Sequence, residues 1–191
     1  MTNRKFSLDY LEELKGLLDA FPHDRFEDVA SAILSAYDDE KQIFIMGNGG
    51  SGSTASHFAC DINKGCCFNA KKKFKVLCLN DNIPTMMAYA NDLSYEKVFV
   101  EQLKNFLKPG DIVIGISGSG NSENVIQAVS YAKENQAKTV GLTGFDGGRL
   151  AQLVDIPLIA SINDMQKVED VHIIVVHMIM QYFCKVLQPD Q

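Results

Sequence analysis

The stretch Gln42-Ile-Phe-Ile-Met-Gly-Asn-Gly-Gly-Ser-Gly52 decides the fold of this chain. Residues 42–46 form a short, continuous apolar run, and a cluster of glycine, asparagine and serine follows at once. A run of this length is typical of a strand that is buried on both faces of a sheet. The small residues after it predict a tight turn into a helix, which is the start of a strand–helix–strand unit.

Four more apolar runs of this kind recur along the chain, at residues 74–79, 111–116, 139–142 and 155–160. Helical periodicity lies between the runs, at residues 53–63, 83–89, 95–106 and 122–135, and a last helix is expected at 164–187. Residues 7–37 predict two leucine-rich helices separated near Pro22. We therefore expect one domain over residues 1–191. Residues 1–40 form a helical pair in it, and residues 41–191 form a three-layer αβα sandwich with a five-stranded parallel sheet.

The overall composition narrows the class of protein. Of 191 residues, 46% are hydrophobic and 22% are charged, which is the usual globular mix. The net charge of −6 argues against a nucleic-acid partner. We find no apolar run near the roughly 18 residues of a membrane span, and no signal peptide, so we expect no membrane partner. Five cysteines without a CxxC pair favour a reducing, cytoplasmic compartment.

Two loops that follow predicted strands are candidate anion sites. Residues 47–52 spell GxGxxG, but a dinucleotide site also needs an acidic residue about 20 positions later, where lysines stand here. We therefore expect no nucleotide. The second loop, Ser117-Gly-Ser-Gly-Asn-Ser122, offers three hydroxyls and a helix N-terminus to a phosphate. The alternative is that Ser122 only caps the helix, which would leave the other two serines unexplained.

Four ionisable side chains on two predicted helices suggest a metal or acid–base site. His57 and Asp61 are four residues apart, so they share one helical face. Glu169 and His177 lie eight residues apart in a last helix that is apolar on nearly every side. Two imidazoles and two carboxylates suit zinc best, and manganese, iron or nickel are alternatives. The competing interpretation is a pair of ordinary ion pairs.

Taken together, these motifs resemble the sugar isomerase (SIS) family, and within it the phosphoheptose isomerases. The segments that carry the resemblance are residues 47–51, His57-Phe-Ala, Asn91-Asp92, and residues 115–122, 141–148 and 168–177. The resemblance implies that sedoheptulose 7-phosphate is isomerised to D-glycero-D-manno-heptose 7-phosphate, at the start of bacterial heptose biosynthesis for lipopolysaccharide or capsule. It also implies a homotetramer with active sites between subunits, often with bound zinc.

The resemblance assigns roles to individual residues. Asp61 and His177 match the catalytic pair, and the metal ligands match His57, Asp61, Glu169 and His177. The positions that match substrate contacts are Asn48, Gly49, Ser51, Asn91, Asp92, Ser117, Gly118, Ser119, Ser122 and Glu169. Two positions depart from the family pattern, because Asp61 stands for a glutamate and Glu169 for a glutamine.

Two other functions stay open at this stage. The chain could isomerise another sugar phosphate, because the shorter Asp61 puts heptose specificity in question. It could also be a non-catalytic SIS protein that binds the bacterial replication initiator. The apolar last helix and the leucine-rich first helix favour a homo-oligomer in every case.

Overall fold

A five-stranded parallel sheet forms the centre of the molecule in a computed structural model that describes residues 2–187. Met1 and residues 188–191 of the expected domain lie outside the described residues. The strands are β1 (Gln42–Gly47), β2 (Lys75–Cys78), β3 (Ile112–Ser117), β4 (Lys138–Gly144) and β5 (Ile156–Ala160). They are ordered β2-β1-β3-β4-β5 and every neighbouring pair is parallel. The expected αβα sandwich is confirmed.

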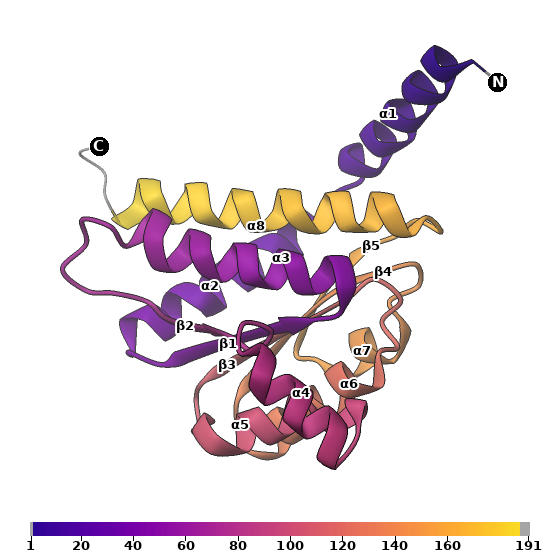
Figure 1. Cartoon of the computed structure of the whole chain (residues 1–191). Helices are drawn as coiled ribbons and strands as arrows, with labels where there is room; N and C mark the ends of the chain where they lie inside the picture. Colours follow the sequence, from indigo (N-terminus) through magenta and orange to yellow (C-terminus); the bar gives the residue numbers. More distant parts are fainter. Residues whose placement is uncertain (1, 188–191) are drawn as a thin grey trace.

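Helices cover both faces of the sheet (Figure 1). One face carries α2 (His23–Asp38), α3 (Gly49–Cys60) and α8 (Met165–Leu187), and the other carries α5 (Val100–Phe106), α6 (Glu123–Glu134) and α7 (Gly148–Leu153). Strand β1 shows why: Ile43 and Ile45 enter the first core, whereas Phe44 and Met46 enter the second. The continuous apolar run in the sequence reflects this burial on both faces.

The strand order brings the two candidate loops together. Strands β1 and β3 are neighbours, with Gly47 paired to Ile116, but the chain continues from them to opposite sides of the sheet. In open parallel sheets, ligands bind in the crevice at this reversal, beyond the carboxyl ends of the strands. The glycine loop follows β1 and the serine loop follows β3, so the fold places both loops at this crevice.

Three local features differ from the sequence prediction. Helix α3 begins at Gly49, four residues earlier than expected, so the glycine loop is its first turn. The same helix continues as a π-helix, η1 (Asp61–Cys66), and π-turns are frequently found at functional sites. Helix α7 was not predicted, because six residues are too short to show a helical period.

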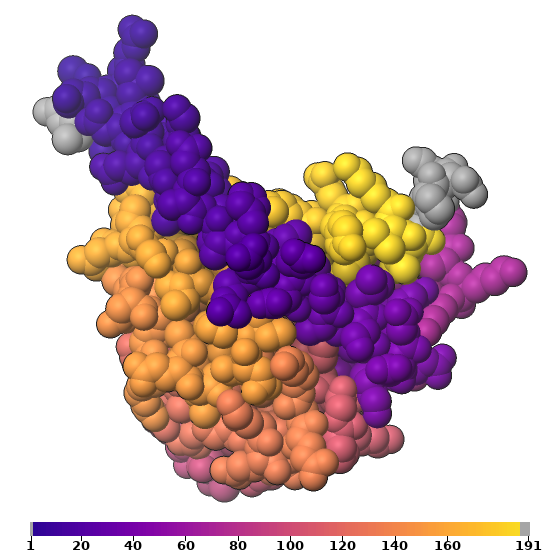
Figure 2. All heavy atoms as spheres, turned by 180° about the vertical axis from the view of Figure 1, so that it is seen from behind, coloured from indigo at the N-terminus to yellow at the C-terminus, as the bar shows by residue number. Residues whose placement is uncertain are grey.

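Helix α1 (Asn3–Asp19) stands away from the body (Figures 1 and 2). None of the residues Asn3–Asp19 is buried. The ammonium group of Lys167 on α8 holds the helix: it pairs with Glu13 at 3.0 Å and lies 4.5 Å from the centre of the Tyr10 ring. The Tyr10 hydroxyl also donates to Asp170 at 2.6 Å. These polar contacts fasten the middle of α1, where Leu8 and Leu11 stay exposed, whereas Leu14, Leu17 and Leu18 are half-buried against the core.

Helix α8 is the one helix among residues 2–187 that is long and apolar enough to cross a membrane, with a mean hydropathy of 1.4 over 18 residues. The sequence analysis had found no stretch near this threshold. In the structure, Val171, Val175 and Ile179 belong to the core between α8 and the sheet. This packing assigns α8 as a core helix, with one apolar side against the sheet and another left open.

Candidate functional site

The glycine loop is built for close approach. The Glu169 carboxylate of α8 lies where a Cβ on Gly50 would stand, so any larger residue at Gly50 would displace this carboxylate from the first turn of α3. The loop is also clamped by Asn80, whose Nδ2 donates to the Gly47 carbonyl at 2.7 Å and whose Oδ1 accepts from the Gly47 amide at 3.2 Å. The sequence analysis missed Asn80. Its position just after β2, at the carboxyl end of the sheet, was the available signal.

The serine loop does not serve as a simple helix cap. The Ser117 hydroxyl donates to Ser122 Oγ at 3.1 Å, and the Ser122 side chain makes no capping bond to α6. Ser119 Oγ accepts from the Asn121 amide at 3.2 Å. The hydroxyls are therefore gathered at the N-terminus of a 12-residue helix, an arrangement that favours an anion such as phosphate.

A pocket of about 570 Å³ adjoins the serine loop. It is lined by the ends of three strands, namely Ser119, Asn121, Phe145, Asp146, Ser161, Ile162 and Asn163. The lining combines hydroxyl, amide and carboxylate groups with the apolar side chains of Phe145 and Ile162, a mixture that suits a hydroxylated ligand. Of these residues, only Ser119 was predicted from the sequence as a substrate-binding residue. The others follow β3, β4 and β5 directly, so strand ends alone would have indicated them.

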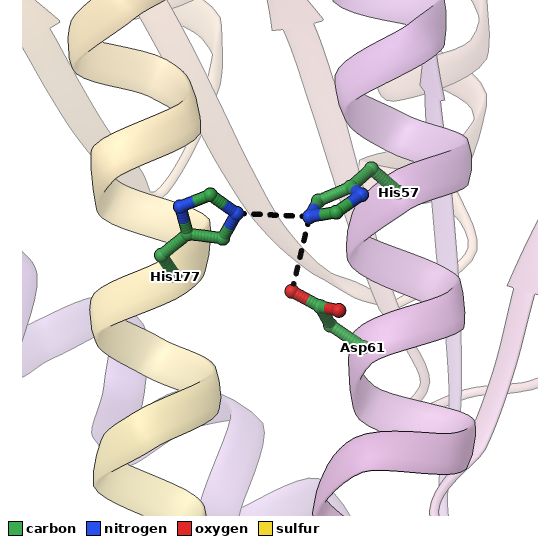
Figure 3. Close-up of side chains that lie close together, drawn as sticks. All are labelled: His57, Asp61 and His177. Carbon is green, nitrogen blue, oxygen red and sulfur yellow. Dashed lines mark hydrogen bonds and ion pairs between the residues drawn. The ribbon is translucent and has the colours of Figure 1, made fainter.

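The second cluster lies between α3 and α8 and joins His57, Asp61 and His177 (Figure 3). The Nε2 atoms of the two histidines are 2.9 Å apart, and His57 Nε2 lies 3.2 Å from Asp61 Oδ2. The rings meet edge to face at 75°. The Asp61 side chain is 20% exposed and that of His57 45%, so the cluster opens to the outer surface of this helical layer. Asp61 is also the residue where α3 becomes π-helical.

The donor atoms of this cluster fit a metal ion. An imidazole nitrogen has one in-plane position, which holds either a proton or a lone pair. His57 Nε2 nevertheless contacts both His177 Nε2 and Asp61 Oδ2, so one proton cannot satisfy both contacts. Zinc bonds of about 2.0–2.1 Å place tetrahedral ligand atoms about 3.4 Å apart, close to these separations. Three convergent lone pairs are the usual donor set of a zinc site that keeps an open position.

Glu169 was expected as a fourth member but lies outside this cluster of His57, Asp61 and His177. Its carboxylate sits against Gly50 instead. The physical reason is the spacing, because eight helical residues separate Glu169 from His177 by about 12 Å. Within one chain, Glu169 belongs to the glycine loop.

The remaining sequence-predicted residues lie around the same crevice. Asn91 and Asp92 end α4 (Ile83–Asp92), are exposed, and bond to each other at 2.8 Å. Tyr95, three residues later in η2 (Tyr95–Lys97), donates its hydroxyl to Asn48 Oδ1 at 2.9 Å. This contact connects the α4 segment with the glycine loop.

His172 is a buried histidine that lies apart from both clusters. It is fully buried, and its Nε2 lies 3.0 Å from the Thr143 carbonyl oxygen. Burial lowers the pKa of His172 to about 4, and the hydrogen bond to Thr143 offsets only part of that effect. His172 is therefore neutral near pH 7 and serves the core between α8 and β4.

Comparisons with known proteins place this chain among relatives of one family and one fold. The family described as the SIS domain matches residues 9–144. A phosphoheptose isomerase from Helicobacter pylori is 37% identical over 147 residues, which cover 77% of this chain and 76% of that protein. A probable phosphoheptose isomerase from Thermoplasma acidophilum is 37% identical over 151 residues, 79% of this chain and 82% of that protein.

Two solved structures are similar over nearly the full length. The phosphoheptose isomerase GmhA from Neisseria gonorrhoeae superposes with a TM-score of 0.88 at 26% identity, covering 95% of this chain and 98% of that chain. A phosphoheptose isomerase from Francisella tularensis gives a TM-score of 0.89 at 25% identity, covering 97% of this chain and 100% of that chain.

Proposed function

This chain belongs to the SIS-domain family, in the branch of the phosphoheptose isomerases, and from that membership we propose that it is an aldose–ketose isomerase for a sugar phosphate. One observation within the chain carries the proposal. His57, Asp61 and His177 converge on a single point, and the same chain holds an anion cradle in its serine loop. A non-catalytic binding protein would have no need for the convergent acid–base groups.

The substrate we propose is sedoheptulose 7-phosphate, with D-glycero-D-manno-heptose 7-phosphate as product. Ser117, Ser119 and Ser122 bind the phosphate, and the α6 N-terminus adds favourable electrostatics. Asn91, Asp92 and the polar lining of the adjacent pocket face the sugar hydroxyls. The similarity to named phosphoheptose isomerases supports this choice over other sugar phosphates.

The proposed reaction is a proton transfer through an enediol. The Asp61 carboxylate removes a proton from C1 of the ketose, beside the C2 carbonyl, exchanges it with solvent, and delivers a proton to C2. His177, whose Nε2 would hold the cation, supplies its Nδ1 proton to the C2 oxygen and takes one back from the C1 hydroxyl. The carbonyl thus moves from C2 to C1, and both residues return to their starting protonation states. A divalent cation held by His57, Asp61 and His177 would supply positive charge beside the sugar oxygens.

We further propose that the active site is assembled from two chains. Gly118 faces Met165 and Val168 of α8, whereas His177 lies 9 to 12 residues further along, about 14–18 Å away at helical rise. An extended seven-carbon sugar phosphate measures only about 10 Å, given C–C bonds of about 1.5 Å. The loops of one chain therefore serve the His57–Asp61–His177 cluster of another, and Glu169 reaches that cluster only from the second chain.

This arrangement requires a homo-oligomer, for which we propose four subunits as the resemblance implies. Exposed apolar side chains support it, because Leu8 and Leu11 on α1 are 58% and 61% exposed and Tyr182 on α8 is also exposed. We assign residues 1–40 to subunit contacts and residues 41–191 to the catalytic core. The five cysteines form no disulfide among residues 2–187, which suits a cytoplasmic enzyme in heptose biosynthesis.

The experiment is an isomerase assay by NMR with five-, six- and seven-carbon ketose phosphates, in protein loaded with zinc. We expect the highest kcat/KM for the seven-carbon substrate and a loss of at least about 100-fold in Asp61→Asn, the range for removal of a general base. Turnover of a five- or six-carbon sugar phosphate, with no activity on the heptulose phosphate, would show that the shorter sugar phosphate is the substrate. No turnover of any sugar phosphate would refute the isomerase.

A further inference from the structure

Asn48 joins three separate segments through one side-chain amide. Its Nδ2 donates to Asn124 Oδ1 at 2.8 Å, and Asn124 Nδ2 donates back to Asn48 Oδ1 at 2.9 Å. The Tyr95 hydroxyl donates to the same Asn48 Oδ1, also at 2.9 Å. A carbonyl oxygen has two lone pairs, so these two donors saturate Asn48 Oδ1.

The three residues come from the three segments that border the crevice. Asn48 belongs to the glycine loop, Asn124 is the second residue of α6 behind the serine loop, and Tyr95 follows the α4 segment of Asn91 and Asp92. Asn124 is itself held rigidly, because it is 2% exposed and its Oδ1 also accepts from the Val125 amide at 2.9 Å. A buried anchor, a loop residue and a surface tyrosine thus share one network.

We infer that Asn48, Asn124 and Tyr95 form a positioning network that holds the glycine loop, the serine loop and the α4–η2 segment in the arrangement that binds substrate. The inference rests on the proposed function, since it assigns these loops to the sugar phosphate. It also changes the expected role of Asn48. Its side-chain oxygen is a strut between loops and is not free to accept a hydrogen bond from a sugar hydroxyl.

Preorganised loops bind a ligand without the conformational-entropy cost of becoming ordered. A looser network should therefore weaken substrate binding more than it slows turnover. Tyr95 isolates this effect. Its side chain is 52% exposed, and its hydroxyl contributes to the network while its ring lies at the surface. Removing only the hydroxyl therefore tests positioning with little disturbance of the core.

The test compares Tyr95→Phe and Asn124→Asp with two matched controls. Tyr37→Phe removes a hydroxyl that donates to the Lys72 carbonyl on the far side of the molecule, and Asn135→Asp changes an exposed asparagine at the other end of α6. The measurements are KM, kcat, the melting temperature, and amide hydrogen exchange of residues 47–52 and 91–99 in the free protein.

We expect Tyr95→Phe to raise KM about 5-fold with kcat within about 2-fold of the parent, as the loss of one hydrogen bond implies. Asn124→Asp should have a larger effect, because it loses the Nδ2 donor and sets a carboxylate oxygen against Asn48 Oδ1. Both variants should exchange amides faster in residues 47–52, and the controls should not. If Asn124→Asp does not fold, Tyr95→Phe decides alone.

The outcomes separate this inference from the proposed function. If the parent turns over no sugar phosphate, the proposed function fails. Hydrogen exchange in the free protein still tests whether the network orders the loops. Parent-like exchange in Tyr95→Phe would overturn the network. A KM change equal to that of Tyr37→Phe, or one that only follows a lower melting temperature, would overturn its positioning role.

Discussion

At the scale of single residues, differences of a few ångströms in side-chain position decide which residues belong to the site. His57 and Asp61 follow the four-residue spacing that the sequence shows, so their meeting was predictable from helix geometry alone. Their contact with His177 was not, because it depends on how α3 packs against α8. The same packing draws Glu169 to Gly50, which sequence spacing could not reveal.

A metal measurement tests the cluster of His57, Asp61 and His177. We expect near-stoichiometric zinc in parent protein purified without chelator, and a loss of affinity of at least about 100-fold in His57→Ala, since one of three ligands in the chain is gone. Glu169→Gln should retain most of the metal, because an amide oxygen still coordinates. His23→Ala, which removes a histidine at the start of α2, is the control.

Equal and negligible metal in all four proteins would refute the metal site. The cluster would then be an ordinary ion pair between His57 and Asp61 with a neighbouring histidine.

A second residue-scale prediction concerns His172 and acid. Its pKa is about 4 in the folded protein and about 6.5 in an unfolded chain. As the pH falls below 6.5, His172 becomes protonated in the unfolded chain but stays neutral in the folded protein. The stability from neutral His172 is therefore complete above pH 6.5 and is lost toward pH 4, up to about 3 kcal/mol at 1.36 kcal/mol per unit.

Urea unfolding at pH 7 and pH 5 measures this effect. The parent should lose about 2 kcal/mol more than His172→Gln, whose amide can still donate to Thr143, over that interval. His23→Gln should behave as the parent. Parallel losses in the parent and His172→Gln would show that another group controls acid sensitivity.

At the scale of elements, the strands were the most predictable part of the chain. Runs such as residues 42–46 are apolar on both faces and end in small residues, and each run became a strand. The π-helical turn from Asp61 was invisible, because π and α turns use the same residue types. The sequence predicts a solvated loop for the basic run at residues 71–75, but not the contacts of its lysines. In the structure, Lys72 Nζ donates to the carbonyl of Asp38, the last residue of α2. Lys75 Nζ donates to the carbonyl of Glu40, which lies two residues beyond the end of α2.

The contacts that Lys167 makes with α1 give a prediction at this scale. In Lys167→Met the apolar stem is kept, but Glu13 and Asp164 lose their partner. We expect several-fold faster amide exchange across Asn3–Asp19, with exchange in β1 and β3 unchanged. Lys64→Met, at the exposed side of η1, is the matched control. Unchanged exchange in α1 would show that apolar contacts hold the helix and that the ion pair of Lys167 with Glu13 is not needed.

At the scale of the whole molecule, the proposed active site needs residues from more than one chain. The topology was predictable, because alternating strands and helices allow few arrangements of a parallel sheet. The resemblance implied active sites between subunits, but the physical reason that we propose for this division, the distance between the serine loop and His177, could not be read from the sequence. The sequence could only indicate apolar faces that need cover.

Complementation between two inactive variants tests this division. Asp61→Asn keeps the substrate loops, and a Ser119→Ala/Ser122→Ala double variant keeps the His57–Asp61–His177 cluster. When the two are co-expressed, random pairing about a two-fold axis regenerates about a quarter of the intact sites, so about a quarter of the parent activity should return. Activity that stays at the level of the separate variants would place the whole site within one chain.

The most direct test of the central claim is deuterium incorporation during isomerisation. Zinc-loaded protein is incubated with sedoheptulose 7-phosphate in deuterium oxide and followed by NMR, with Asp61→Asn in parallel. The account predicts a heptose 7-phosphate that carries deuterium at C2, formed by the parent, and neither product nor deuterium in Asp61→Asn. Absence of both aldose and deuterium in the zinc-loaded parent would contradict it.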